Sequence, residues 1–494
     1  MATKQACVGS SRRPELGFGW TWRGSGVRHT SWVGYAFDRL GFLQFEQLCG
    51  LLLELEGGVG AGAWVGEADR CRSVLSGTSL EPPLTGSVMA APVLLQCAWI
   101  RSGDWNDLLD GVRALVWRRP EDFSVAASFV LLTNLEVPAW CDRAVAQLVG
   151  PGEVRVGVLG SGELGARVDA RVELRRAMPS VLGLCDLNPL IDPEVAGRSS
   201  LDRDAARQLA RVFVPTREYR RALGVLTEHR FAVLTGPPEM GKTAIARMIG
   251  LAQMTAGWEA HECVGPDDVW RTFDAERAQV FIADDAFGST EYRPGAAERW
   301  ALDMERILRA LDDRHWLIWT SRPAPLRTGL DRLHRERGAE RFPAPGEVLV
   351  DAGQLDPAEK TLIVFRHAKA ADLPDATRAA IRASGPQIVA HRHFTPERIR
   401  RLVAGVKLLS PGPVDLARLV GSELANSTEA MAMSFAALSV EHRDLLVSML
   451  DTPPGPVTER DLTHALRRHH AGALPHPPAE LVDRLTDHFL RVLA

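Results

Sequence analysis

The chain has 494 residues, which is enough for about three domains. With 46% hydrophobic and 24% charged residues it can bury several ordinary cores, and its formal net charge of -4 gives no whole-chain attraction to nucleic acid. No apolar run approaches the roughly 20 residues that a membrane span needs, and no secretion signal is recognisable, so we expect a cytoplasmic protein without a membrane partner. The seven cysteines are scattered and never spaced as C-x-x-C, which predicts free buried thiols.

The first part of the chain divides into a tail and a small α/β domain. Residues 1–30 are rich in Gly, Ser and Arg and show no clear periodicity, which is typical of a partly ordered tail. Within residues 31–185, apolar side chains repeat with helical spacing over 41–55 and predict an amphipathic helix. Strand-like runs follow at 92–100, 128–133 and 154–159.

A glycine pattern follows the last of these runs. Gly160, Gly162 and Gly165 fit G-x-G-x-x-G after a strand, which is also the pattern of many dinucleotide sites. It lies late in its domain, however, and no strand ending in an acidic residue occurs about 20 residues further on. We therefore favour a turn that feeds a short helix.

Residues 186–227 predict an arginine-rich helical linker. Asp202 and Thr216 are suited to cap two helices, and Tyr219 falls on the inward face of the second. Two interpretations are open for this tyrosine. The simpler is a docked linker helix, and the alternative is direct contact between Tyr219 and the adenine of a bound nucleotide.

A phosphate-binding loop is the strongest motif of the chain. An apolar strand beginning at Phe231 runs into the pattern G-x-x-x-x-G-K-T and is followed by a helix with a buried stripe, which disfavours a chance match in a turn. Gly236 and Gly241 let backbone N–H groups surround phosphate oxygens, Lys242 supplies a cation, and the hydroxyl of Thr243 can ligate Mg²⁺. The loop interior replaces the more usual glycine-bearing sequence with Pro237, Pro238, Glu239 and Met240.

Two further apolar runs predict parallel strands of the same domain. Residues 279–283 end in Asp284 and Asp285, of which one carboxylate can hold the Mg²⁺ shell and the other can polarise an attacking water. A solvated acidic pair at a strand end is the alternative. Residues 316–320 are closed by Arg322, which could sense a γ phosphate, and the helical spacing between the runs gives the order that a parallel sheet requires.

The remainder of the chain is helical. Asp356-Pro357 and Thr395-Pro396 are cap-plus-proline helix starts within residues 346–415, which predict a helical lid. The arginines after the second start either lie on a solvated helix surface or reach phosphate; they are Arg398, Arg400 and Arg401. Residues 416–494 contain two short helices and a closing apolar segment at 489–493, which predict a winged-helix-like module.

The loop and the strand ends together resemble the STAND NTPases, specifically the third class of novel STAND domains. The resemblance rests on Phe-Ile-Ala-Asp-Asp-Ala-Phe-Gly at 281–288 and Trp-Thr-Ser-Arg at 319–322, and it covers about residues 200–410. It implies a signal-transduction ATPase that uses ATP and Mg²⁺, with an N-terminal effector and a C-terminal sensor. The role that it implies is prokaryotic antiviral defence.

The same resemblance implies roles for individual residues. Lys242 and Thr243 would bind phosphate and Mg²⁺, and Asp284 would complete the metal shell. Asp285 would activate water, and Arg322 would sense the γ phosphate.

The N-terminal domain resembles the Mrr-type restriction endonuclease fold over about residues 35–185. Glu46, Asp69 and Gln96 match the residues that hold Mg²⁺ in those nucleases. The lysine that stabilises the hydroxide is replaced by Ala98, and losing one such electrostatic contact typically costs about 10²-fold or more in rate. The resemblance therefore implies a nuclease fold whose cleavage activity is lost.

The sequence thus predicts an α/β multidomain protein, in which a P-loop NTPase parallel sheet at 228–345 follows the endonuclease-like domain and precedes the helical lid and the winged-helix-like domain. We expect a slow ATP hydrolase acting as a switch, with a homo-oligomer on activation, DNA and an unidentified trigger protein as further partners. The alternatives are an ATP-dependent restriction nuclease and a nucleic-acid- or partner-binding module gated by nucleotide.

Overall fold

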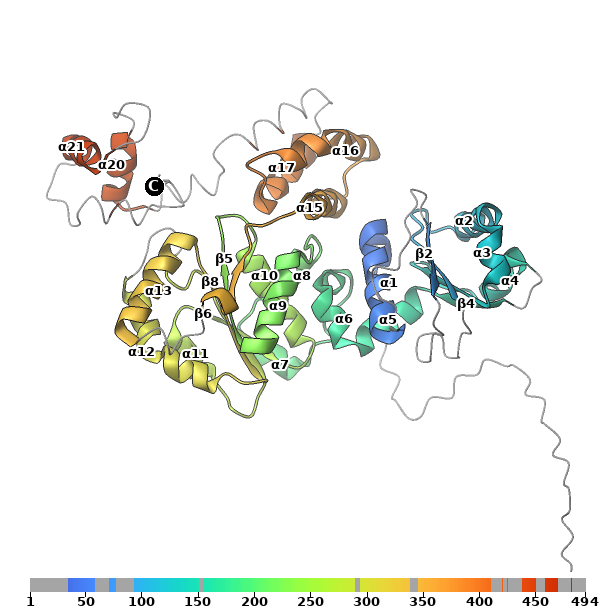
Figure 1. Cartoon of the computed structure of the whole chain (residues 1–494), viewed down its shortest axis with the longest axis horizontal. Helices are drawn as coiled ribbons and strands as arrows, with labels where there is room; N and C mark the ends of the chain where they lie inside the picture. The colour runs from blue at the N-terminus through green and yellow to red at the C-terminus, as the bar shows by residue number, and fades with distance from the viewer. Residues whose placement is uncertain are drawn as a thin grey trace, which may run out of the picture.

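The computed structural model (Figure 1) describes residues 34–57, 71–76, 93–150, 154–288, 294–337, 345–409, 438–449 and 458–469, with positions 420, 424 and 481. The expected tail at 1–30, Asp69 and the closing segment at 489–493 lie outside the described residues. Five of the cysteines are described in full, and all are free and buried, as predicted: Cys49, Cys97, Cys141, Cys185 and Cys263.

A four-stranded mixed sheet forms the N-terminal unit. Its strands, in spatial order, are β1 (Cys71–Ser76), β2 (Val93–Ala98), β3 (Ser128–Thr133) and β4 (Arg155–Leu159). β1 pairs antiparallel with β2, and the other two pairings are parallel. The three predicted strands are confirmed, with β2 and β4 slightly shorter than expected.

Both faces of this sheet are covered, and for that reason β2 and β3 are buried at every position. One face packs on α1 (Phe42–Gly57), which confirms the helix predicted at 41–55, and the preceding turn η1 (Phe37–Arg39) belongs to the same core. The other face packs on three helices: α2 (Trp105–Arg118), α3 (Pro120–Val125) and α4 (Cys141–Val149).

The glycine pattern at 160–165 is a turn that feeds a helix, as predicted. Gly160 caps α5 (Ser161–Ala170), and its N–H donates to the Glu163 carboxylate over 3.2 Å. A Cβ atom at this position would lie 2.6 Å from the Leu135 carbonyl oxygen, so the glycine serves close packing against the preceding loop. The chain continues through α6 (Val172–Ala177) and η3 (Pro179–Leu184).

The linker helices dock firmly on the rest of the molecule. They are α7 (Pro193–Arg198), α8 (Arg203–Ala210) and α9 (Arg217–His229). Asp202 caps α8 and Thr216 caps α9, as predicted. Tyr219 is fully buried and its hydroxyl donates to the Arg176 carbonyl over 2.6 Å, so the docked-helix interpretation is confirmed and the alternative adenine contact is wrong.

The second sheet has five strands, all parallel, in the order β6-β7-β8-β5-β9. They are β5 (Phe231–Thr235), β6 (Glu259–Cys263), β7 (Gln279–Ala283), β8 (His315–Thr320) and β9 (Leu349–Asp351). The predicted strands β5, β7 and β8 are confirmed. The helices of this unit are α10 (Lys242–Met254), α11 (Pro266–Thr272), α12 (Pro294–Ala310), α13 (Pro323–Arg337) and α14 (Pro345–Val348).

The two sheet units share one hydrophobic core, and α1, α5 and α6 lie between them in Figure 1. The α6 arginines carry the polar part of this junction. Arg175 donates to the Thr255 hydroxyl over 3.0 Å and to its carbonyl over 3.1 Å, and Arg176 donates to the Gln253 side chain over 2.7 Å. The N-terminal unit therefore abuts the C-terminal end of α10.

Three helices follow the second sheet, in the segment predicted as a helical lid: α15 (Pro357–Ala370), α16 (Asp375–Ala390) and α17 (Pro396–Leu409). Asp356 caps α15, as predicted. Beyond them, α20 (Val440–Ser448) and α21 (Glu459–His469) pack on each other, while most of the segment predicted as winged-helix-like lies outside the described residues. Within the described part of the chain, none of the helices has the length and apolar character needed to cross a membrane.

Candidate functional site

The loop between β5 and α10 has the backbone of a phosphate cradle. Gly236 has φ +129° and Gly241 has φ +90°, values that only glycine adopts readily. A Cβ atom on Gly236 would also lie 2.9 Å from the Gly353 nitrogen, because the end of β9 passes directly beside the loop. Glu239 has φ +64°, so the loop interior places a non-glycine residue in the left-handed region.

The ammonium of Lys242 lies across this loop. It donates to the Gly236 and Pro237 carbonyls, each over 2.8 Å. Burial lowers the pKa of Lys242 to about 8, against the attraction of Asp285 and with the repulsion of Arg322 adding to the effect. A buried cation whose hydrogen bonds among the described residues go to two neutral carbonyls is well suited to receive the negative charge of a phosphate.

Thr243, Asp284 and Thr320 form a hydrogen-bonded chain at the carboxyl ends of β7 and β8. The hydroxyl of Thr243 donates to Asp284 Oδ1 over 2.8 Å, and the hydroxyl of Thr320 donates to the same oxygen over 2.6 Å. The Asp285 N–H in turn donates to Thr320 Oγ1 over 2.9 Å. Thr320 ends β8, which lies directly beside β7 in the sheet. Its hydroxyl therefore contacts and orients both Asp284 and Asp285, which follow β7.

Asp285 and Arg322 line the same pocket as the loop. Asp285 adopts φ +47°, a strained backbone conformation for a non-glycine residue. Burial lowers the pKa of Arg322, and the Asp285 carboxylate opposes that shift. Nη1 of Arg322 is buried and has no hydrogen-bond partner among the described residues, which leaves it able to donate to an anion in the pocket.

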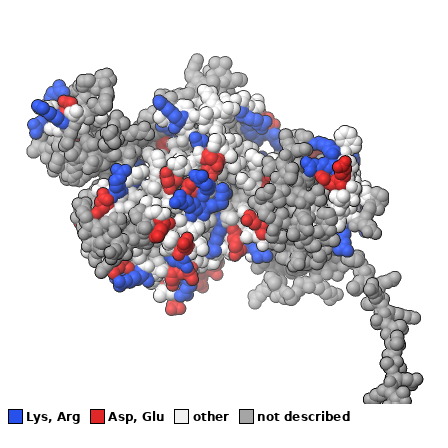
Figure 2. Space-filling view, viewed as in Figure 1, with Lys and Arg blue, Asp and Glu red and all other residues white. Residues whose placement is uncertain are grey.

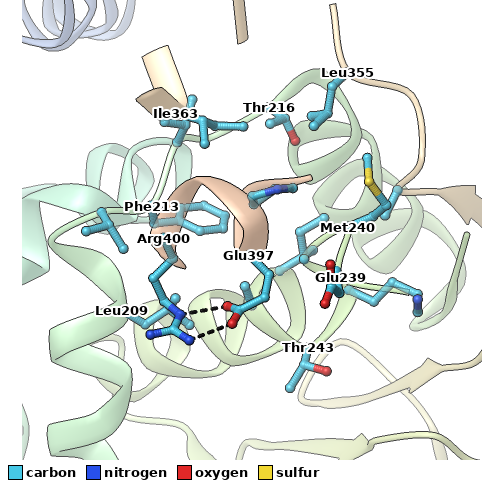
Figure 3. A pocket seen from close by; sticks show the side chains of 18 of the residues that line it. Leu209, Phe213, Thr216, Glu239, Met240, Thr243, Leu355, Ile363, Glu397 and Arg400 are labelled. Carbon is cyan, nitrogen blue, oxygen red and sulfur yellow. Dashed lines mark hydrogen bonds and ion pairs between the residues drawn. The ribbon is translucent and has the colours of Figure 1, made fainter. Parts of the chain in front are cut away.

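The pocket has a volume of about 410 Å³ and a second, apolar end. Figure 3 shows Leu209 and Phe213 from the linker and Ile363 along one side of the pocket, and Leu355 on the other side, above Met240. His367 also lines the pocket, and burial together with the nearby Arg400 lowers its pKa to about 4, so that it is neutral at pH 7. An apolar end beside a cationic end fits a nucleotide, whose base is flat and whose phosphates are charged.

The lid helix α17 contacts the loop through Glu239. The Thr395 hydroxyl donates to the Glu239 carboxylate over 3.1 Å, Arg401 lies 3.4 Å from it and Arg398 3.8 Å. Arg400 lines the pocket and forms a two-pronged ion pair with Glu397, at 2.7 and 2.6 Å, drawn as dashed lines in Figure 3. Arg398 and Arg401 are thus largely buried against the loop, whereas Arg400 is 57% exposed on the helix surface, as one of the two sequence interpretations expected.

The donor set at the ends of α10 and β7 fits Mg²⁺. The Thr243 hydroxyl and the Asp284 carboxylate are hard oxygen ligands, they already lie 2.8 Å apart, and Thr243 lines the pocket. In such sites Mg²⁺ neutralises the charge that builds up on phosphate oxygens.

Two of the three expected nuclease residues are described. Glu46 on α1 is 7% exposed and Gln96 on β2 is fully buried, and neither amide atom of Gln96 has a hydrogen-bond partner among the described residues. Asp69 lies outside the described residues. No cluster of three or more His, Cys, Asp or Glu side chains suited to a metal ion occurs within the described ranges.

Sequence reasoning missed the orienting role of Thr320 and the apolar wall of the pocket. A threonine at the end of a predicted strand is a weak signal of such a role. The position of Thr320 directly before Ser321 and Arg322 was the one feature of the sequence that could have indicated it. The wall comes from the turn after α8 and from the start of the lid, segments that are 140 residues or so apart and that only the fold brings together.

Comparison with known proteins gives one family match and a number of loose structural likenesses, of which two are described. PCH-2 of C. elegans is 14% identical, with 45% of this chain and 71% of that chain covered and a TM-score of 0.29. NtrX from Brucella abortus in complex with ADP is 13% identical, with 71% and 81% covered and a TM-score of 0.27. No curated protein matches the sequence. Residues 213–370, which contain the loop, the strand ends and α15, match the family Novel STAND NTPase 3.

Proposed function

We propose that the protein is a STAND-like switch that binds ATP with Mg²⁺ and hydrolyses it slowly. One observation carries the proposal: Lys242, Thr243, Asp285 and Arg322 line a single pocket that also has apolar walls, and Thr243 is hydrogen-bonded to Asp284. The family match over 213–370 supports the same class of site.

In this proposal each side chain has one task. The loop N–H groups and Lys242 bind the phosphates, Thr243 and Asp284 hold the metal ion, and Thr320 keeps Asp284 in place. Asp285 accepts the proton of the water whose oxygen attacks the γ phosphorus, while the bond from that phosphorus to the bridging oxygen breaks and leaves ADP. Arg322 donates to the γ phosphate through its unpaired Nη1.

Nucleotide binding is tested by thermal unfolding of the full chain. ATP-Mg²⁺ at about 1,000 times its Kd should stabilise the fold by roughly 4 kcal/mol and raise the Tm. Lys242→Ala should abolish the shift, whereas Lys360→Ala, on α15 and outside the pocket lining, should keep it. An equal shift in Lys242→Ala would show that ATP binds elsewhere.

Turnover is tested by separating the two aspartates. Asp285→Asn should keep ATP affinity while hydrolysis falls by about 10² or more, because the proton acceptor is lost. Asp284→Asn should instead weaken Mg²⁺-dependent binding, because the metal ligand is altered. Exchanged phenotypes would reverse the two assignments.

We further propose that the switch serves prokaryotic antiviral defence and that the N-terminal unit is a nuclease-fold effector or decoy that does not cut DNA. Ala98, where a cation would be needed, is 1% exposed on β2, and Gln96 is buried. On the face that Figure 2 shows, the described acidic and basic side chains are interspersed. Plasmid incubated with the protein, Mg²⁺ or Mn²⁺ and ATP should stay intact; cutting that Asp69→Ala abolishes would establish an active nuclease instead.

Three further parts complete the proposal. They are formation of a homo-oligomer on activation, recognition of a trigger protein, and contact with DNA through the N-terminal unit. The mass of the full chain with ADP and with ATP, measured by light scattering, tests the first of these. A constant monomer mass in both states would remove the oligomer from the proposal.

A further inference from the structure

A second cavity lies between the N-terminal unit and the lid, away from the loop. It has a volume of about 590 Å³ and is bounded by the start of α1, the segment after β2, and the helices α15 and α16. In Figure 1 these elements meet to the right of the second sheet, where α15 lies beside the upper end of α1. The volume falls within the range of about 300–1,000 Å³ that small-molecule sites occupy.

The walls of this cavity are aromatic and aliphatic. Phe42 comes from α1, Trp99 follows β2, and Phe365 comes from α15. Phe365 remains 36% exposed and the neighbouring Leu43 41% exposed, although both line the cavity. Two large apolar side chains that stay this accessible inside a concavity offer surface for an apolar ligand.

Helix α16 leaves the space open. Gly385 and Pro386 lie inside this helix, where proline cannot donate a backbone hydrogen bond. Both line the cavity, and a Cβ atom on Gly385 would meet no other atom within 4 Å. A larger side chain at this position would therefore enter the cavity without a backbone clash.

Four cationic side chains line the same cavity: Arg101, Lys369, Arg378 and Arg382. Asp375 at the rim offsets part of this charge, since it accepts hydrogen bonds from Arg101, over 2.5 Å, and from Arg378. Lys369 lies 5.5 Å from the Trp99 ring centre. Burial, followed by repulsion from Arg378, lowers the pKa of Lys369, and Asp38 opposes the shift.

We propose that this cavity binds an organic anion with a flat aromatic body, the body between Trp99 and Phe365 and the anionic group at the α16 arginines. A flat ring can stack on aromatic faces, and one guanidinium group can donate two parallel hydrogen bonds to the oxygens of a phosphate, sulfonate or carboxylate. The site is separate from the nucleotide pocket, and its test requires no nucleotide.

Two fluorescent probes test the proposal on the full chain. 8-Anilinonaphthalene-1-sulfonate carries the aromatic body and the anionic group, whereas N-phenyl-1-naphthylamine has the same body without charge. We expect the sulfonate to bind at least about tenfold more tightly, since one strong charge-assisted hydrogen bond lowers the Kd by about tenfold. Equal affinity of the two probes would overturn the anionic part of the proposal.

Variants locate the site. Gly385→Leu should weaken binding of both probes at least about tenfold by filling the cavity, and it should not unfold the protein, because leucine favours a helix more than glycine does. Arg378→Gln with Arg382→Gln should lower the affinity for the sulfonate toward that of the neutral probe. Arg392→Gln, an exposed arginine beyond the end of α16, should change neither affinity. Unchanged probe binding in a folded Gly385→Leu variant would place the probe elsewhere and refute the site.

Discussion

At the residue scale, Thr320 does more than its place in the sequence indicates. Its hydroxyl donates to Asp284 and accepts from the Asp285 N–H, so one small side chain positions the proposed metal ligand and the proposed proton acceptor together. Partners of this kind, one step removed from a metal ion, typically contribute about 10- to 100-fold to metal affinity or activity.

Thr320→Val therefore should lower ATP hydrolysis and the Mg²⁺ dependence of binding by about 10- to 100-fold, since valine has the same shape without the hydroxyl. Thr320→Ser should retain most of the activity. Thr235→Val is the matched control, because Thr235 ends the neighbouring strand β5 and its hydroxyl has no hydrogen-bond partner among the described residues. Equal losses in the two valine variants would remove the orienting role of Thr320.

Lys242 makes nucleotide binding depend on pH. Its folded-state pKa is lowered to about 8 by burial, so the charged form that a phosphate prefers is fully present below pH 8 and is lost as the pH rises through that value. The affinity for ATP-Mg²⁺ should therefore fall by up to about tenfold per pH unit above pH 8. Calorimetric titrations between pH 7 and 9.5 measure this; Lys242→Ala should bind weakly throughout and show no such decline.

At the element scale, periodicity predicts the apolar strands and helices but misses the polar edge of the second sheet. β6 reads Glu-Ala-His-Glu-Cys and has no apolar run, yet Glu259 and His261 are buried. Glu259 is satisfied there by Arg198 and, over 2.9 Å, by Gln279. Such a strand depends on partners that lie 20 to 61 positions away in the chain, which no local pattern reveals.

The candidate site divides in the same way. The loop and the strand ends follow a local pattern with fixed spacing, so Lys242, Thr243, Asp284, Asp285 and Arg322 could be assigned to one site before any fold was known. The apolar wall of the pocket and the contact between α17 and Glu239 could not be assigned from the sequence, because both need the helices after β9 to fold back over the loop.

The contact between α17 and the loop is itself testable. Glu239, Arg398 and Arg401 have side chains only 10–14% exposed, so removing Glu239 would leave two largely buried guanidinium groups without its charge. Glu239→Ala should loosen α17 by about 1–2 kcal/mol, measured as about tenfold faster amide exchange in that helix. Glu305→Ala, which breaks a pair with the exposed Arg309 on α12, away from α17, should have almost no effect on that helix.

A second substitution at this position distinguishes the contribution of the Glu239 side chain from that of its backbone conformation. Glu239→Gly loses the same contacts but relieves the left-handed conformation, which costs a non-glycine residue about 1 kcal/mol. It should therefore release α17 as Glu239→Ala does, while the loop itself becomes more stable by about that amount. If Glu239→Gly left α17 as protected as in the wild type, the carboxylate would have no role in holding the lid.

At the scale of the whole molecule, the lid and the N-terminal unit meet around a buried charge. Arg366 on α15 is 1% exposed and donates to the Arg39 carbonyl over 3.1 Å, while its Nε and Nη2 have no hydrogen-bond partner among the described residues. Burial lowers its pKa to about 10, so the cost of burying the cation is present at every pH below that value.

Arg366→Met should accordingly stabilise the protein, by about 1–3 kcal/mol, since a flexible apolar side chain of similar length can fill the same space. Denaturant unfolding at pH 7 measures the change. Arg113→Met, at an exposed ion pair on α2, should stay within about 0.5 kcal/mol of the wild type. Destabilisation by Arg366→Met would mean that interactions at this junction offset the free-energy cost of burying the guanidinium group.

Helix α15 separates the two cavities and contributes to both. Ile363 and His367 line the nucleotide pocket, whereas Val364, Phe365 and Lys369 line the cavity beside the N-terminal unit. Both cavities are formed in one and the same packing, so a ligand in either should favour the packing that the other ligand also needs.

We therefore expect positive coupling between the two sites. Saturating 8-anilinonaphthalene-1-sulfonate should tighten ATP-Mg²⁺ binding by about fivefold or more, and ATP-Mg²⁺ should tighten binding of the probe by the same factor, because linkage is reciprocal. Gly385→Leu should abolish the effect of the probe on ATP affinity while leaving ATP affinity without the probe unchanged, since Gly385 lines only the second of these cavities. Independent binding, with a factor of one in both directions, would show that α15 separates the two sites without transmitting a change between them.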